Sequence, residues 1–181
     1  VQALQPPAAA SPKTMPTPLP LLLFLVAAPG AAAQITWAGI NAKIDQKFPE
    51  AHSLSVEDLD SQMRVGPVLL IDVRAPAEFA VSQIKGAINL QDAAAIAERF
   101  PDRKMKLVLY CSVGYRSARE TQALQRMGYL DAWNVRGSIF EWANKGHPVY
   151  RGAEQVHVVH PFNNKWGVLL KPGLHPLGFI H

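Results

Sequence analysis

Two largely apolar runs constrain the fold of this chain more than any other feature of its sequence. The first run covers Val68–Val73, with one acidic residue near its end, and the second covers Lys106–Tyr110. Runs of this length without regular polar alternation are typical of strands buried on both faces of a parallel sheet. Helical patterns lie between and after the two runs. Strands that alternate with helices indicate an α/β domain with a mainly parallel sheet.

The other expected elements follow from apolar spacing and from residues that start or stop helices. Ser55 begins a capping-box pattern, and Gly128 follows the most regular helical stretch. The segment 151–181 has no clear period, and we expect it to pack over the domain surface. The sequence predicts helices at Ile35–Phe48, Ser55–Met63, Pro76–Val81, Ala93–Phe100, Ser117–Met127 and Ile139–Asn144, and further strands at Ala87–Leu90 and Ala132–Val135.

Composition excludes several classes of protein. The chain has 181 residues, of which 49% are hydrophobic, and a net charge of +4. Such a chain can bury a core, so disorder throughout is excluded, and its length favours one domain with appendages. Lys and Arg form no run, so we do not expect nucleic acid as a partner. A single cysteine, Cys111, excludes an intrachain disulfide and a cysteine-rich metal centre.

The first 33 residues differ from the rest of the chain. Their apolar run, Leu19–Ala28, is shorter than the roughly 20 residues of a membrane-spanning helix. The small residues Ala31–Ala33 follow it and fit a signal-cleavage site. This pattern predicts an exported, periplasmic or secreted protein that begins at Gln34 and keeps no membrane span. A disordered leader and an uncleaved anchor remain alternatives, and translation can start at Val1 or at Met15.

Cys111 directly follows the second apolar run and precedes the predicted helix Ser117–Met127. Ligands of parallel α/β sheets bind at the carboxyl ends of the strands, where this residue lies. The following helix directs free N–H groups and a positive dipole end toward the loop, and Gly114 permits the positive φ of an anion-binding nest. These amides and Arg116 favour the thiolate, which predicts a reactive nucleophile. The alternative is a buried structural cysteine.

Four separated segments around this loop carry a family resemblance. One of the four is the active loop itself, Cys111–Ser117. The other three are Leu70–Arg74 with Glu78-Phe79, then Ile84–Asn89, and finally Gly128-Tyr129 followed by Val135–Ser138 and Trp142. Over roughly residues 52–150 the chain resembles the rhodanese-like (sulfurtransferase) family. The resemblance implies a three-layer fold, with a five-stranded parallel sheet flanked by helices, and a catalytic cysteine that carries a sulfane sulfur as a persulfide. The family often has His at position 83 and a second Gly at position 138, whereas this chain has Gln83 and Ser138.

The resemblance also implies the reaction. A small sulfane-sulfur donor gives its outer sulfur to Cys111, and a thiol, cyanide or a protein acceptor then removes it, as in a thiosulfate:cyanide assay. No cofactor or metal is required. The related phosphatases have a loop one residue longer between Cys and Arg, so the shorter Cys111–Arg116 loop favours sulfur transfer. A non-catalytic sulfur carrier or partner-binding module is an alternative, and a phosphatase-like hydrolase is a third.

The remaining site residues receive supporting roles. We expect Arg116 to steady the anionic sulfur, Ser117 to cap the helix, and Asp72 to accept hydrogen bonds from the loop. Arg74 and Glu78 are four residues apart and are expected to form an ion pair. The active loop also contains Ser112, Val113, Gly114 and Tyr115. The predicted organisation is a leader at 1–33, a helical extension at 34–51, the rhodanese-like domain at 52–150 and a tail at 151–181.

Overall fold

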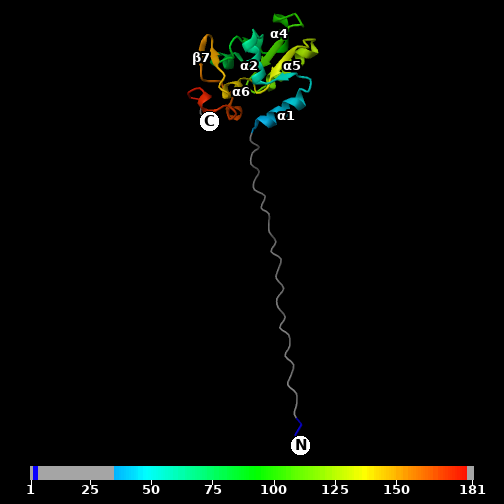
Figure 1. Cartoon of the computed structure of the whole chain (residues 1–181), viewed down its shortest axis with the longest axis vertical. Helices are drawn as coiled ribbons and strands as arrows, with labels where there is room; N and C mark the ends of the chain where they lie inside the picture. The colour runs from blue at the N-terminus through cyan, green and yellow to red at the C-terminus, as the bar shows by residue number, and fades with distance from the viewer. Residues whose placement is uncertain (1, 4–34, 179–181) are drawn as a thin grey trace. The chain divides into compact units, whose positions relative to one another are not determined.

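A computed structural model of the chain describes residues 2–3 and 35–178, and it shows an α/β domain (Figure 1). Its main sheet has five strands, all parallel, in the order β1-β5-β4-β2-β3. This arrangement confirms the predicted fold class. Apart from residues 2–3, the predicted leader lies outside the described residues, and so does the predicted start at Gln34. The strands are β1 (Ser53–Leu54), β2 (Leu70–Asp72), β3 (Ile88–Asn89), β4 (Leu107–Tyr110) and β5 (Ala132–Val135).

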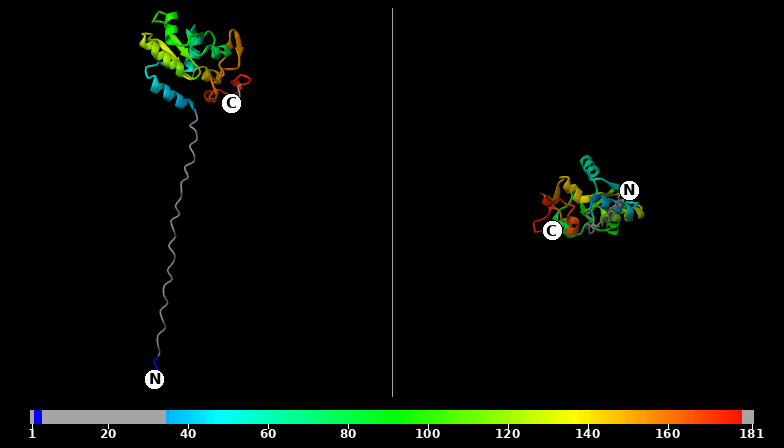
Figure 2. Two further views of the ribbon diagram at one scale, coloured as in Figure 1. Left: turned by 180° about the vertical axis from the view of Figure 1, so that it is seen from behind. Right: turned by 90° about the horizontal axis from the view of Figure 1, so that it is seen from below.

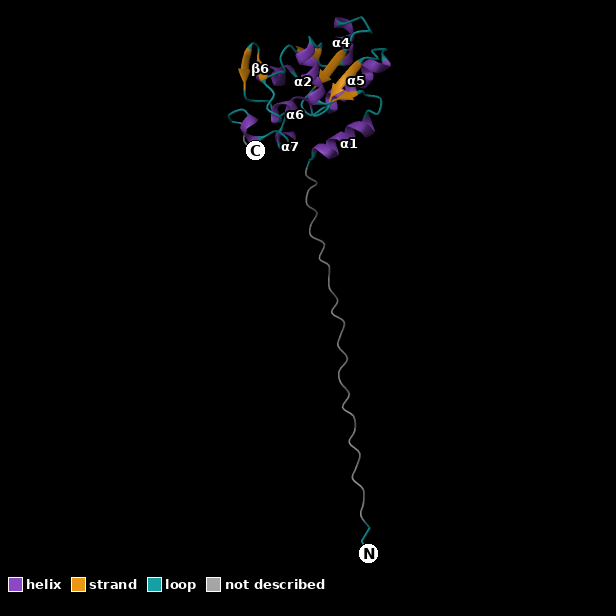
Figure 3. Cartoon of the chain, in the orientation of Figure 1, coloured by secondary structure: helices purple, strands orange, loops and turns teal. Residues whose placement is uncertain are grey.

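Helices cover both faces of the sheet (Figure 3). Two helices begin after a side-chain N-cap: Ser55 caps α2 through a complete capping box with Asp58, as its sequence pattern indicated, and Asp92 caps α4. No helix among residues 2–3 and 35–178 has the length and apolar character that crossing a membrane requires. The helices are α1 (Trp37–Lys47), α2 (Val56–Val65), α3 (Pro76–Val81), α4 (Ala93–Arg99), α5 (Tyr115–Arg126), α6 (Ser138–Asn144) and α7 (Asn164–Gly167), with a short 3₁₀ helix at Pro172–Leu174.

The central strand β4 shows why its sequence has no polar alternation. Successive side chains of a strand point to opposite faces, and all four residues of β4 are fully buried. Leu107 and Leu109 pack into one apolar cluster with residues of α4 and α5, and Val108 and Tyr110 pack into a second cluster with residues of α2 and α6. Burial on both faces leaves only the strand ends open for chemistry.

The C-terminal segment is built onto the domain. β6 (Val149–Arg151) and β7 (Glu154–Val156) form an antiparallel hairpin, and the chain then continues through α7. Figures 1 and 2 show this segment, coloured orange to red, gathered on one side of the domain. The Asn144 side chain of α6 donates to the Leu169 carbonyl and accepts from the Lys171 amide, so α6 holds the segment in place.

Candidate functional site

Cys111 lies at the carboxyl end of β4, in the loop that leads to α5. Its Sγ accepts a hydrogen bond from the Gly114 amide at 3.2 Å, and its own amide donates to Ser138 Oγ at 3.1 Å. The residue is 1% exposed. The loop therefore folds back on the sulfur and holds it at a fixed position.

Gly114 gives the loop its shape. Its φ is +101°, and a Cβ at this position would lie 3.3 Å from the Val135 carbonyl oxygen, so a side chain would be both strained and crowded. The glycine is also the N-cap of α5, which begins at Tyr115. The expectation that Ser117 caps this helix is therefore wrong. Ser117 lies inside the first turn, and its hydroxyl donates to Asn134 Oδ1 at 2.7 Å.

Ser138 is a site residue that sequence reasoning assigned no role. Its φ is +49°, an uncommon conformation for a residue with a side chain. The hydroxyl accepts from the Cys111 amide and donates to the Val135 carbonyl at 2.8 Å, so it ties the start of α6 to the loop that contains Cys111. The sequence offered one signal for this conformation: Ser138 directly follows Gly137, at a position where the family that the chain resembles often has a second glycine.

Arg116 forms an ion pair with a carboxylate that lies outside the loop. Its two terminal nitrogens each lie 2.7 Å from one oxygen of the Glu78 carboxylate, which comes from α3 and is 4% exposed. Ser112 Oγ bridges Arg116 and Glu78: it accepts a hydrogen bond from Arg116 at 3.0 Å and donates one to Glu78 at 3.1 Å. The expected Arg74–Glu78 pair is therefore wrong. Because α3 begins only at Pro76, Arg74 lies outside the helix and does not share a helix face with Glu78.

Arg74 instead pairs with Asp72, and both are fully buried. The Arg74 guanidinium donates to both Asp72 oxygens, with the shortest contact 2.6 Å, and also to the Ser82 carbonyl. The expected hydrogen bonds from the active loop to Asp72 are thus replaced by bonds from Arg74, including one from its amide. Asn89 closes this cluster by donating to the carbonyls of Asp72 and Arg74 at 2.8 Å.

The electrostatic environment of Cys111 favours the thiolate. Burial raises the pKa of the thiol, but the Arg116 charge and hydrogen bonding from the backbone amides of Ser117 and Gly114 outweigh it, so the pKa lies below its usual value. The pKa of Glu78 is also lowered, because its hydrogen bonds and charge interaction with Arg116 outweigh the effect of burial. Arg116 therefore stabilises two anions at once.

A cavity of about 180 Å³ opens onto the sulfur. Its walls are mainly apolar or aromatic, and Tyr115 of the active loop lies among them. Two residues that do not line the cavity contact the Tyr115 ring: the Phe48 ring, with a centroid distance of 5.0 Å, and the Lys43 ammonium, 5.7 Å from the ring centroid. The lining residues are Cys111, Ser112, Val113, Tyr115, Arg116, Phe162 and Trp166.

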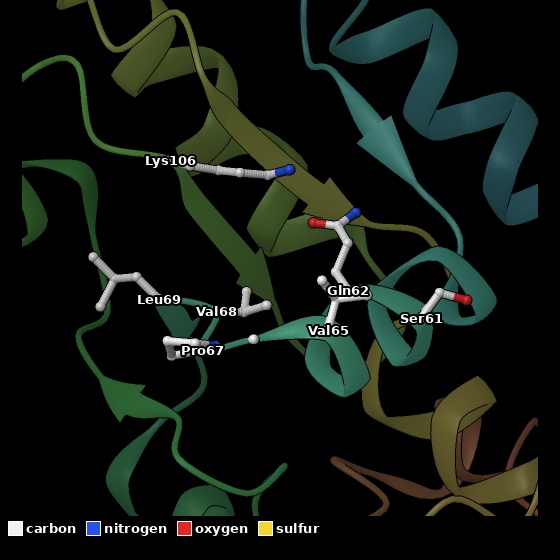
Figure 4. A pocket seen from close by; sticks show the side chains of 8 residues that line it. Ser61, Gln62, Val65, Pro67, Val68, Leu69 and Lys106 are labelled. Atoms are coloured by element: carbon white, nitrogen blue, oxygen red, sulfur yellow. The ribbon is translucent and has the colours of Figure 1, made fainter.

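A larger hollow, of about 530 Å³, lies at the other ends of the same strands. Lys106 precedes β4, and Val68 and Leu69 precede β2 (Figure 4). Cys111, in contrast, follows β4. The lining of the hollow holds one cation and no cysteine, so it lacks the thiol of the cavity at Cys111. No group of three or more His, Cys, Asp or Glu side chains that could hold a metal ion occurs in the part of the chain that the structure describes.

The model of the rhodanese-like domain matches residues 55–145, half of the chain. The chain belongs to the rhodanese-like domain family. A sulfurtransferase of Allochromatium vinosum is 34% identical over 101 residues, which cover 55% of this chain and 91% of the relative. The thiosulfate:glutathione sulfurtransferase of Homo sapiens is 31% identical over 110 residues, covering 52% of this chain and 96% of the human protein.

A solved structure extends the comparison to the fold. The thiosulfate sulfurtransferase of Pseudomonas aeruginosa superposes with a TM-score of 0.55 at 18% identity, covering 74% of this rhodanese-like chain and 26% of the other. This likeness supports the fold alone. The two sequence relatives, both named sulfurtransferases, support sulfur transfer as the general activity of the chain.

Proposed function

We propose that Cys111 is the nucleophile of a sulfurtransferase and carries the transferred sulfur as a persulfide. The observation that supports this most directly is the Cys111 Sγ itself. It has a lowered pKa, accepts from the Gly114 amide and faces a cavity with room for a small donor. A thiolate held in this way is a soft nucleophile that needs no separate general base.

The proposed reaction has two displacements. The Cys111 thiolate attacks the outer sulfur of a donor, a sulfur–sulfur bond forms, and the donor's remaining group leaves with the electron pair of the broken bond. A thiol or cyanide then attacks the outer sulfur of the persulfide and regenerates the thiolate. Arg116 and the amides of the loop stabilise the negative sulfur in both steps.

Mass spectrometry of the intact protein tests this proposal. After incubation with thiosulfate, the chain is expected to gain the mass of one sulfur atom, and cyanide is expected to remove it as thiocyanate. Because Cys111 is the only cysteine, the adduct can be assigned without peptide mapping. A Cys111→Ser variant that still turns over thiosulfate and cyanide would overturn the assignment.

The two alternatives make different predictions in the same assays. A sulfur carrier or docking module takes up one sulfur atom but turns over only when a partner protein is added. A phosphatase-like hydrolase gains no sulfur and hydrolyses an aryl phosphate. The loop between Cys111 and Arg116 is one residue shorter than the phosphatase loop, which favours the sulfur chemistry.

We also propose that the chain is exported after cleavage following Ala33. The support is the sequence pattern, an apolar run at Leu19–Ala28 followed by Ala31–Ala33. N-terminal sequencing of exported protein is expected to begin at Gln34. Recovery of the uncleaved chain in a membrane fraction would show an anchor instead.

A further inference from the structure

Two aromatic residues complete the cavity above Cys111 from outside the family-matched region. Phe162 and Trp166 belong to the C-terminal segment, beyond the matched residues 55–145, yet both line the cavity. We propose that these two rings form an aromatic wall that selects the sulfur donor. It favours donors whose outer sulfur is attached to a flat, apolar organic group over thiosulfate. The proposal rests on the sulfur-transfer function proposed above.

The segment that carries the aromatic wall is anchored in the core. Val159, on one side of Phe162, is fully buried, and Leu170, after Trp166, is 2% exposed. Asn163 caps α7 by accepting from the Trp166 amide at 3.1 Å. Both rings are therefore placed by packed structure and hydrogen bonds, which a specific wall requires.

Phe162 has a conformation that core packing does not explain. Its φ is +66°, which is rare for a bulky residue, although the residue is 42% exposed. This backbone places the ring 4.8 Å from the Arg116 Cζ, and the Phe162 amide donates to His160 Nδ1 at 3.0 Å. Strained residues cluster at ligand clamps, where the surrounding structure holds them in place. The strain here positions an aromatic ring at the mouth of the sulfur site.

The charges around the cavity favour donors with few negative charges. Among the seven residues that line the cavity, Arg116 alone carries a permanent charge, and Glu78 already engages it through two 2.7 Å contacts. Thiosulfate brings two negative charges toward a site that also holds the Cys111 thiolate. A monoanion with an apolar group meets less repulsion and gains contact with the rings of Phe162 and Trp166.

The same chemical step serves each donor class. With an organic thiosulfonate, the Cys111 thiolate attacks the terminal sulfur, the bond between that sulfur and the sulfonyl sulfur breaks, and a sulfinate leaves with the electron pair. With an organic persulfide, the leaving group is a thiolate, and with thiosulfate it is sulfite. Charge is conserved in all three cases and no other reactant is consumed. In the first two cases the organic group lies where Phe162 and Trp166 can contact it.

A series of three donors tests the aromatic wall. The kcat/KM for thiocyanate formation is measured with benzenethiosulfonate, methanethiosulfonate and thiosulfate, with cyanide as the acceptor. For each protein, the kcat/KM of one donor is divided by that of another. Comparing this ratio between a variant and the wild type removes the difference in intrinsic chemical reactivity between the donors. Phe162→Leu and Trp166→Leu are each expected to lower the ratio of benzenethiosulfonate to methanethiosulfonate by about threefold to tenfold, the effect of one aromatic contact.

A matched control uses an aromatic residue outside the cavity. The Tyr150 ring contacts the Lys85 ammonium at 5.5 Å and does not line the cavity, so Tyr150→Leu is expected to leave the donor ratio unchanged. Thermal unfolding checks that Trp166→Leu is folded. If it is not, Phe162→Leu decides the question, because its side chain is partly exposed.

The outcomes separate this inference from the function on which it rests. If the wild-type chain gains sulfur at Cys111 but both leucine variants keep the wild-type donor ratio, the aromatic wall is refuted and sulfur transfer stands. A control variant that changes the ratio as much as the wall variants refutes the wall as well. If the wild type gains sulfur from none of the three donors, both proposals fail.

Discussion

Replacing Arg116 by glutamine tests two effects of its positive charge: the contribution to the free energy of unfolding and the lowering of the pKa of the Cys111 thiol. The guanidinium makes two 2.7 Å contacts with Glu78, whose carboxylate is nearly inaccessible to water. Glutamine removes the positive charge and leaves this carboxylate buried without a counter-charge. It also removes the main favourable charge acting on the Cys111 thiolate.

The expected loss of stability follows from burial. Removing one partner of a buried ion pair costs about 3–5 kcal/mol. The Arg116 side chain is 27% exposed, so water can partly replace it, and we expect Arg116→Gln to lose about 2–3 kcal/mol of unfolding free energy at pH 7. The double variant Glu78→Gln/Arg116→Gln buries no charge at this point and is expected to recover most of that loss.

The pH dependence has a definite sign. In the wild type the pKa of Glu78 is lowered, so the pair contributes stability above the unfolded-state pKa of about 4.3 and loses it as the pH falls through the folded-state pKa. In Arg116→Gln burial acts on Glu78 without the arginine, and the pKa of the carboxyl rises. The stability difference between variant and wild type is therefore greatest at neutral pH and shrinks on acidification.

Two assays separate the roles. Urea unfolding at pH 7 and pH 4 measures stability, and the pH profile of alkylation measures the acidity of the only thiol. We expect the alkylation profile to move to higher pH in both the single and the double variant, with stability recovered in the double variant alone. An unchanged alkylation profile would refute the action of Arg116 on the sulfur. A double variant no more stable than the single variant would refute the buried-charge argument.

Three further substitutions test other parts of the site. Cys111→Ser is expected to abolish sulfur uptake measured by mass, while urea unfolding shows a stability change below about 1 kcal/mol, because the hydroxyl can still accept from Gly114. Ser138→Ala is expected to lose roughly 2 kcal/mol in the same unfolding assay, because it removes the acceptor of the buried Cys111 amide; equal stability would contradict this role. Asp72→Asn leaves the fully buried Arg74 without its counter-charge and is expected to cost about 3 kcal/mol or more, so a wild-type melting curve would refute the pairing.

The sequence predicted best where local pattern and burial agree. β5 and α3 have the predicted bounds. Cys111 lies at the carboxyl end of β4, as predicted, because a strand buried on both faces leaves a clear apolar run in the sequence. β1 was not predicted as a strand, since its two residues show no period, and its identity comes from pairing with β5. The hairpin that begins at Val149 was missed as well, because it carries only three residues in each strand.

Side-chain partners were predicted less well than elements. An ion pair between Arg74 and Glu78 was expected from their four-residue spacing, but this spacing brings side chains together only where the intervening residues are helical. Glu78 and Arg116 are 38 residues apart, and only the tertiary fold brings them together. Ser138 could not be assigned from sequence either, because its role depends on a positive φ that packing imposes.

Arg116 lies in the first turn of α5, where the helix dipole disfavours a cation, so its position needs an electrostatic explanation. The Glu78 carboxylate supplies it through two hydrogen bonds, and Arg116 also lowers the pKa of Cys111. Because the negative charge of Glu78 offsets the positive charge of the guanidinium, the pair presents little net positive charge to a second negative group on the donor. The family-matched residues therefore account for an acidic, nucleophilic sulfur but leave the choice of donor weakly determined. That choice falls to the apolar side of the cavity, where Phe162 and Trp166 lie beyond the matched domain. Rhodanese-like chains that share the loop but differ after this point are thus expected to share the chemical step and differ in the donor.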